Sequence, residues 1–260
     1  MRWLRLLPMS CLASALVVAG CSSKPAPPPA AAEPAKPAVV YFHVDPASAG
    51  SVSGTVLYTG RKPARKLIDL SSDPACVKSH QGKVYDESLI VDGKGHLGNA
   101  FVYISKGLEG KNFEVPSTSV TIDQRGCWFR PRVMGIQTGQ VLDIINSDPV
   151  THNIHPMAHT NREWNHSMGP GDEPLHRRFI KSEIMIPVKC NIHSWMHAFI
   201  GVVDHPYYAV TKDDGSFEIK NLPVGTYTLT VWHENMDPQE QQITVAAGSS
   251  VASNFTFKGK

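Results

Sequence analysis

The sequence predicts an all-β protein. No apolar pattern with helical spacing continues for more than two turns in its 260 residues, so no long amphipathic helix is expected. Short runs in which apolar and polar residues alternate recur instead, for example in residues 216–219 and 226–232. Turn residues separate these runs: Asp214-Gly215 offers the positive φ that a tight hairpin needs, and Pro223 fixes the next corner. The expected architecture is therefore a set of antiparallel sheets packed as sandwiches.

The first element along the chain is a targeting segment. Arg2 and Arg5 precede an apolar run over residues 6–18, which is too short to span a bilayer and is typical of a signal peptide over residues 1–20. The small residues directly before Cys21 resemble the bacterial lipoprotein signal. That resemblance implies an acylated Cys21 and a protein of the bacterial cell envelope that faces the periplasm, at the outer membrane rather than the inner one.

Residues 21–38 are rich in proline and alanine, which predicts an extended linker without a core. The whole chain carries 25 basic and 23 acidic residues, and this balance does not favour a nucleic-acid partner. No second apolar run is long enough to cross a bilayer. We therefore expect contact with a membrane through the lipid anchor only.

Short strands at both ends of the globular part indicate one divided domain. Strand patterns near the C-terminus and its Asp-Gly and Pro-x-Gly turns resemble the carboxypeptidase regulatory-like, or transthyretin-like, β-sandwich. Residues 205–258 are too few for a full sandwich, and patterns at 51–60 and 100–104 resemble its opening strands. We expect its first part at 46–112, its second at 205–258, and another domain inserted at 113–204. The alternative is one continuous N-terminal domain over residues 40–204.

The inserted region ends in a candidate metal-binding loop. Cys190, His193 and Met196 follow one another at intervals of three and offer a thiolate, an imidazole and a thioether, the donors that soft and borderline metals prefer. Ile184, Ile186 and Val188 alternate with other residues before the loop, and this period of two directs Cys190 into the apolar layer. A buried thiolate with nearby soft donors is expected.

A second histidine has to come from another segment. His152 follows a predicted strand at 139–146 and the polar break around Pro149, which places it at a sheet edge. With this segment and the loop, the chain resembles the cupredoxins, and most closely the amicyanin-like and plastocyanin-like ones, which have a Greek-key β-sandwich. The resemblance implies one type 1 (blue) copper ion, with Asn153 linking the two ligand segments. The ligands that it implies are His152, Cys190, His193 and Met196.

Several alternatives stay open for the metal site. His155, His159 and His197 compete for ligand positions, and zinc is the alternative metal. Residues 156–181 form a polar stretch that predicts a surface loop, and its basic residues 176–181 indicate a solvated face.

Five cysteines occur in the sequence. Cys11 lies in the signal segment and Cys21 is the expected lipid site. Export to an oxidising compartment then makes Cys76 and Cys127 a candidate disulfide, with two separate buried thiols as the alternative. Cys190 is left as the unpaired thiol.

These predictions favour a lipid-anchored electron-transfer protein rather than an enzyme. The expected partner is a redox protein such as a c-type cytochrome or a periplasmic dehydrogenase. We expect the His193 ring edge near the surface, within an apolar collar suited to brief docking. The alternatives are a copper-dependent redox enzyme with an open coordination position, and a structural or copper-storage module of the envelope.

Overall fold

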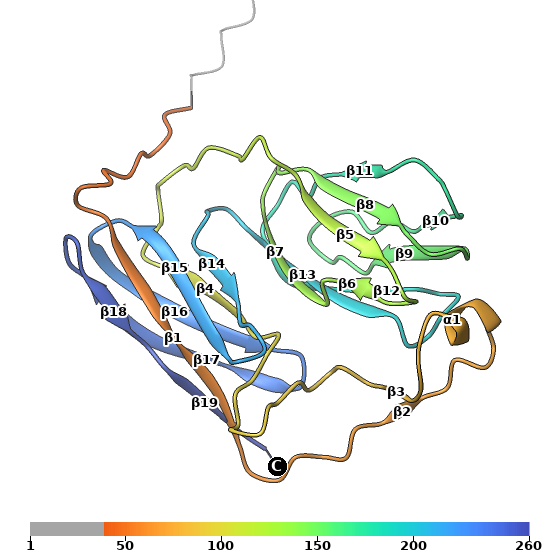
Figure 1. Ribbon diagram of the computed structural model, residues 1–260. Coiled ribbons are helices and arrows are strands. Elements are labelled where there is room, and N and C mark those ends of the chain that lie inside the picture. The colour runs from red at the N-terminus through yellow and green to blue at the C-terminus, as the bar shows by residue number, and fades with distance from the viewer. Residues whose placement is uncertain (1–38, 260) are drawn as a thin grey trace, which may run out of the picture. The chain divides into compact units, whose positions relative to one another are not determined.

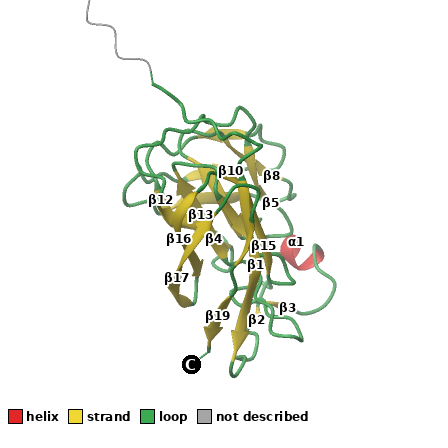
Figure 2. Ribbon diagram, turned by 90° about the vertical axis from the view of Figure 1, so that its left-hand side faces the viewer, coloured by secondary structure: helices red, strands yellow, loops and turns green. Residues whose placement is uncertain are grey.

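The computed structural model describes residues 39–259. The predicted signal peptide (1–20), the lipid site at Cys21 and the linker (21–38) lie outside the described residues. The all-β prediction is confirmed, because strands form nearly all the regular structure and α1 (Pro74–Lys78) is the one α-helix between residues 39 and 259 (Figure 2). In that part of the chain no helix has the length and apolar character needed to cross a membrane.

One β-sandwich contains strands from both ends of the described chain (Figure 1). Its first sheet has the order β15-β1-β18, and β19 also pairs with β1. Its second sheet has the order β14-β4-β16-β17. The strands are β1 (Gly50–Thr59), β4 (Phe101–Lys106), β14 (Tyr208–Val210), β15 (Ser216–Leu222), β16 (Gly225–His233), β17 (Met236–Val245), β18 (Ser250–Ala252) and β19 (Phe255–Lys258).

Alternating residues of these strands form a core of their own, which includes Val52, Val56, Ile104, Leu229 and Phe255. Strands β1 and β4 precede residue 113 and β14 to β19 follow residue 204, yet they share sheets. The predicted domain boundaries themselves stay predictions.

The second β-sandwich contains every strand between β4 and β14. One sheet has the order β10-β9-β12-β13-β7 and the other β11-β8-β5-β6. Two pairs are parallel, β13 with β7 and β5 with β8. Parallel neighbours need connections that cross between the sheets, as in Greek-key sandwiches. The strands are β5 (Val120–Gln124), β6 (Phe129–Arg130), β7 (Val133–Gln137), β8 (Leu142–Asn146), β9 (His152–Pro156), β10 (His166–Met168), β11 (Leu175–Arg177), β12 (Glu183–Lys189) and β13 (His197–Val203).

Strand β12 leads into the predicted metal-binding loop, and it departs from the expected alternation at one point. Ile186, Val188 and Cys190 are buried as expected, but Ile184 is exposed. The reason is a bulge: Met185 has φ 59° and the pairing with β13 shifts register between Glu183 and Ile186. Each residue before the bulge therefore faces the opposite side from the one predicted.

The stretch 156–181 is not the continuous surface loop that the sequence predicts. It contains β10, which pairs with β9, and β11, which pairs with β8. Both are three-residue strands at sheet edges with mostly exposed or half-exposed side chains, so they lack the apolar alternation that identifies a strand.

Between β1 and β4 the chain leaves the first sandwich. This excursion carries β2 (Leu67–Ile68), α1 and β3 (Val84–Tyr85). Leu70 and Cys76 pack into the core of the second sandwich, and Cys76 forms a disulfide with Cys127. Figure 1 shows α1 beside the end of the second sandwich that also carries β6.

The two sandwiches also meet through strands β7 and β13. Gly135 and Gly201 are paired on these strands, and a Cβ atom on Gly201 would lie 2.6 Å from the Phe101 ring. The two glycines thus let Phe101 and Tyr208 pack directly on the sheet. Beside them Arg132 and Glu234 form a two-point ion pair at 2.7 and 2.8 Å with both side chains largely buried.

Candidate metal centre

His152 reaches the centre from the first residue of strand β9. Its side chain is fully buried, and so is that of Ile154, which lies on the same strand face. His155 lies on the opposite face, where its ring contacts Asn191 and Glu163. The alternation of side chains along β9 therefore directs His152 to the centre and His155 away from it.

The loop after β12 folds into a compact turn. Cys190 N–H donates to the Met196 carbonyl at 3.2 Å, and Met196 N–H donates to the His193 carbonyl at 3.0 Å. The His193 N–H points at the Cys190 sulfur at 3.4 Å. These bonds place the sulfur, the His193 ring and the Met196 backbone together, as the loop spacing predicts.

Three donor atoms from the two segments converge. His152 Nδ1 lies 2.9 Å from His193 Nδ1, and Cys190 Sγ lies 3.9 Å from His193 Nδ1. Donor atoms of all three residues lie within 4.8 Å of one another, and all three residues are buried. One thiol and two imidazoles in this arrangement are the donors of a trigonal copper site.

The outer nitrogens of both rings are held by carboxylates. His152 Nε2 lies 2.8 Å from Asp148 Oδ2, and His193 Nε2 lies 3.1 Å from Asp73 Oδ2. A carboxylate accepts a hydrogen bond, so it assigns the ring proton to Nε2 and leaves a lone pair on Nδ1. Two Nδ1 atoms 2.9 Å apart need either a shared proton or a metal ion between them. The residues present therefore fit a bound metal ion.

Electrostatics favour the metal-binding form of the thiol. Burial raises the pKa of Cys190, but interactions with His152 and with the backbone around Asn153 and His193 outweigh it, so the pKa is lowered. The pKa of Asp148 is also lowered, because hydrogen bonds from His152, Cys127 and Gly126 outweigh burial. A thiolate is the form of cysteine that binds metals.

Asn153 connects the two ligand segments. Its side-chain oxygen accepts the Asn191 N–H at 2.7 Å and lies 3.4 Å from the Cys190 sulfur. Its amide nitrogen donates to Asn165 at 2.6 Å. This is the role that the cupredoxin resemblance implies for Asn153.

Met196 is fully buried and belongs to the same core cluster as Cys190. His197, its neighbour and competitor, is exposed at the start of β13. His159 is exposed as well, and its backbone N–H donates to Glu183. Among the described residues, neither of these histidines belongs to a group of potential ligands.

The expected exposure of the His193 ring edge is wrong. His193 is only 2% exposed, because Asp73 covers its Nε2 and the Trp195 ring packs beside it with centroids 5.1 Å apart. The predicted apolar collar for docking therefore lacks the exposed ring edge on which it depends.

Asp148 and Asp73 are the site residues that the sequence analysis misses. Asp148 stands four residues before His152, so proximity along the chain is a usable signal. Asp73 precedes Pro74, a pattern typical of a helix N-cap, but its contact with a residue 120 positions away depends on the tertiary fold.

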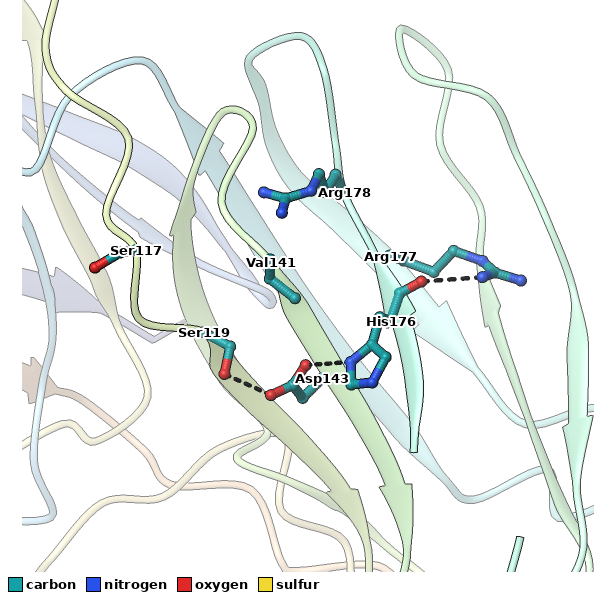
Figure 3. Close-up of a pocket in the computed structure, with 7 residues that line it drawn as sticks. All are labelled: Ser117, Ser119, Val141, Asp143, His176, Arg177 and Arg178. Atoms are coloured by element: carbon teal, nitrogen blue, oxygen red, sulfur yellow. Dashed lines mark hydrogen bonds and ion pairs between the residues drawn. The ribbon is translucent and has the colours of Figure 1, made fainter. Parts of the chain in front are cut away.

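A second arrangement of serine, aspartate and histidine lies elsewhere in the second sandwich (Figure 3). Ser119 lies 2.5 Å from Asp143, and Asp143 lies 2.6 Å from His176, in an open depression of about 650 Å³. The Ser119 hydroxyl donates to the carboxylate and not to the imidazole, so the cluster lacks the order of a Ser–His–Asp triad, in which the imidazole accepts the hydroxyl proton. Arg178 is turned to the Gly139 carbonyl, and the cluster carries no catalytic assignment.

Residues 197–258 match the carboxypeptidase regulatory-like domain family. The match starts in β13, a strand that the structure pairs with β12 and β7 in the second sandwich, and continues to β19. No curated protein matches the chain.

Solved structures that resemble part of the chain include a reductase, a cupredoxin and an amicyanin. A Cu-containing nitrite reductase from Thermus scotoductus SA-01 is 21% identical over 38% of this chain, with a TM-score of 0.32. This likeness spans 25% of the length of the reductase. A purple cupredoxin from Nitrosopumilus maritimus is 19% identical over 32% of this chain and 99% of its own (TM-score 0.28). The oxidised form of an amicyanin mutant is 16% identical over 39% of this chain and 97% of its own (TM-score 0.30).

Proposed function

We propose that this protein binds one copper ion in a type 1 site formed by His152, Cys190, His193 and Met196, and that it transfers electrons. The observation that carries the proposal is the convergence of the buried Cys190 sulfur with two imidazole nitrogens that lie 2.9 Å apart. When bound, copper would supply a one-electron Cu(I)/Cu(II) couple.

The residues around the centre favour electron transfer over catalysis. The three donors are buried and their outer contacts are fixed by Asp148, Asp73 and Asn153, so little has to move between two oxidation states. A catalytic site needs access for a substrate, and the burial of both histidines opposes it. We therefore propose an electron carrier and not an enzyme.

Copper loading tests the proposal directly. The protein without residues 1–20, loaded with copper under anaerobic conditions and then oxidised, should bind one ion per chain. It should show the intense visible absorption of thiolate-to-copper charge transfer. Cys190→Ser should lose this absorption while keeping the far-ultraviolet circular dichroism spectrum, because a hydroxyl cannot replace the thiolate. Wild-type protein without the absorption, or a Cys190→Ser variant that retains it, would refute the assignment.

We also propose the cellular setting that the sequence predicts: a lipoprotein attached through Cys21 to the envelope, whose partner is a periplasmic redox protein. The anchor is tested by metabolic labelling with a fatty acid. Labelling and membrane association should both be lost in Cys21→Ser. A labelled Cys21→Ser variant would exclude this attachment site.

A further inference from the structure

Both oxygens of the Asp73 carboxylate are engaged. Oδ1 caps helix α1 by accepting the N–H groups of Ala75 at 2.9 Å and Cys76 at 3.3 Å. Oδ2 lies 3.1 Å from Nε2 of His193. The cap fixes the carboxylate on its own helix, so the direction of the second oxygen toward the ring is fixed as well.

Helix α1 is anchored to the second sandwich at a single turn. The disulfide joins Cys76 of the helix to Cys127, and His80 Nε2 lies 2.7 Å from the Gly126 carbonyl. Cys76 and Cys127 are both buried. Because covalent and polar contacts hold the same turn, the segment 70–80 stays over the His193 ring.

The same turn holds the other carboxylate of the centre. Gly126 N–H and Cys127 N–H donate to Asp148, each at 2.7 Å, and Asp148 contacts His152. Trp195 Nε1 donates to the Cys127 carbonyl at 3.1 Å. The Cys76 sulfur lies within 4.8 Å of donor atoms of Asp73 and His193. The Cys127 sulfur lies equally close to donor atoms of Asp148 and His152. The disulfide thus links the supports of both histidines.

We propose that Asp73 is the positioning residue of the loop ligand His193, and that the segment 70–80 is a fixed cover over the copper centre. The carboxylate keeps the ring proton on Nε2, which leaves Nδ1 available to the metal, and the cover prevents the ring from turning out toward solvent. The effect on copper rests on the proposed function, but the hydrogen bond itself belongs to the metal-free protein.

Three substitutions separate positioning from helix capping. Asp73→Asn retains a good N-cap but turns an amide N–H₂ toward the ring, a donor facing a donor, which favours the Nδ1–H tautomer. Asp73→Ser retains the cap and is too short to reach the ring. Asp69→Asn is the matched control, because Asp69 directly precedes this segment and its carboxylate accepts from the Ser71 N–H.

The first readout is the tautomer of His193 in the metal-free protein, measured by ¹H–¹⁵N long-range correlation NMR. We expect wild type and Asp69→Asn to show the Nε2–H form with a slowly exchanging proton. Asp73→Asn and Asp73→Ser should lose the slow exchange, and Asp73→Asn should shift the tautomer. A wild-type ring in the Nδ1–H form, or an Asp73→Ser variant with wild-type exchange, would overturn the proposal.

The second readout is the rate at which a chelator removes Cu(I). Loss of a carboxylate that holds a ligand histidine typically weakens metal binding by about 10- to 100-fold, so removal should accelerate about 10-fold or more in both Asp73 variants and not in Asp69→Asn. Equal rates in all four proteins would refute the positioning role while leaving the copper proposal standing. If the wild type binds no copper, the function proposal fails and the NMR result still decides the role of Asp73.

Discussion

Removal of Arg132 should lower the free energy of unfolding, because it breaks a largely buried ion pair between the two sandwiches. Arg132 on the β7 side and Glu234 after β16 are 4% and 10% exposed, and they form two bonds at 2.7 and 2.8 Å. Arg132→Met leaves the Glu234 carboxylate buried without its partner. Breaking a buried pair in this way costs about 3–5 kcal/mol of the free energy of unfolding.

The double variant Arg132→Met/Glu234→Leu removes both charges and fills the space with apolar side chains. Such replacements are often neutral or stabilising, so we expect it to recover at least about 2 kcal/mol relative to Arg132→Met. Urea unfolding, followed by tryptophan fluorescence and circular dichroism, measures both values.

Lys220→Met is the control, because it breaks an ion pair with Glu218 in which the two side chains are 68% and 50% exposed. Its stability should change by less than about 0.5 kcal/mol. The single variant Glu234→Leu completes the comparison. If the stability loss of the double variant equalled the sum of the losses of Arg132→Met and Glu234→Leu, the reasoning would be refuted, because the loss could then not come from an unpaired buried charge.

Other predictions concern pH, packing and the link between the ligand segments. Burial lowers the pKa of His233 to about 4, and the Arg132 charge acts in the same direction. In the unfolded chain a histidine takes up a proton near pH 6.5. The free energy of unfolding should therefore fall by up to about 3 kcal/mol as the pH decreases from 6.5 to 4. Urea titrations at several pH values should show a flatter profile for His233→Gln, and an unchanged profile would contradict this. Gly201→Ala should lower the free energy of unfolding by about 1–3 kcal/mol, since its Cβ would lie 2.4 Å from a methionine methyl group. Gly93→Ala, whose Cβ would have no atom within 4 Å, should leave the thermal melt nearly unchanged. Asn153→Ala should lower the free energy of unfolding by about 1–3 kcal/mol, because it leaves the half-buried Asn191 N–H without its acceptor. Asn153→Asp keeps an acceptor and should be milder; equal losses would argue against that hydrogen bond.

The inner part of the candidate centre could be predicted because it depends on local geometry. The three-residue intervals from Cys190 to Met196 fit one turn, and the period of two in β12 buries the sulfur. His152 requires only that a strand begins at this residue with the ring facing inward. These patterns survive in the sequence because each involves neighbouring residues.

The outer part could not be predicted, because it depends on contacts between distant segments. Asp73 reads as an ordinary helix cap, and only the packing of α1 on the Gly126–Cys127 turn brings it to His193. The bulge at Met185 is also invisible in the sequence, since a non-glycine residue with positive φ carries no pattern of its own. The sequence therefore predicts the position of His193 but not its burial.

The origin of α1 in the excursion between β1 and β4 determines how the protein can be divided. A fragment of residues 113–204 would contain His152, Cys190, His193 and Met196, but neither Asp73 nor Cys76. Cys127 would become a free thiol, and the loop histidine would lie at an open edge. The centre thus takes its donors from the strands and loops of the second sandwich and its cover from the segment between β1 and β4. A fragment without that segment would therefore report the properties of a different site.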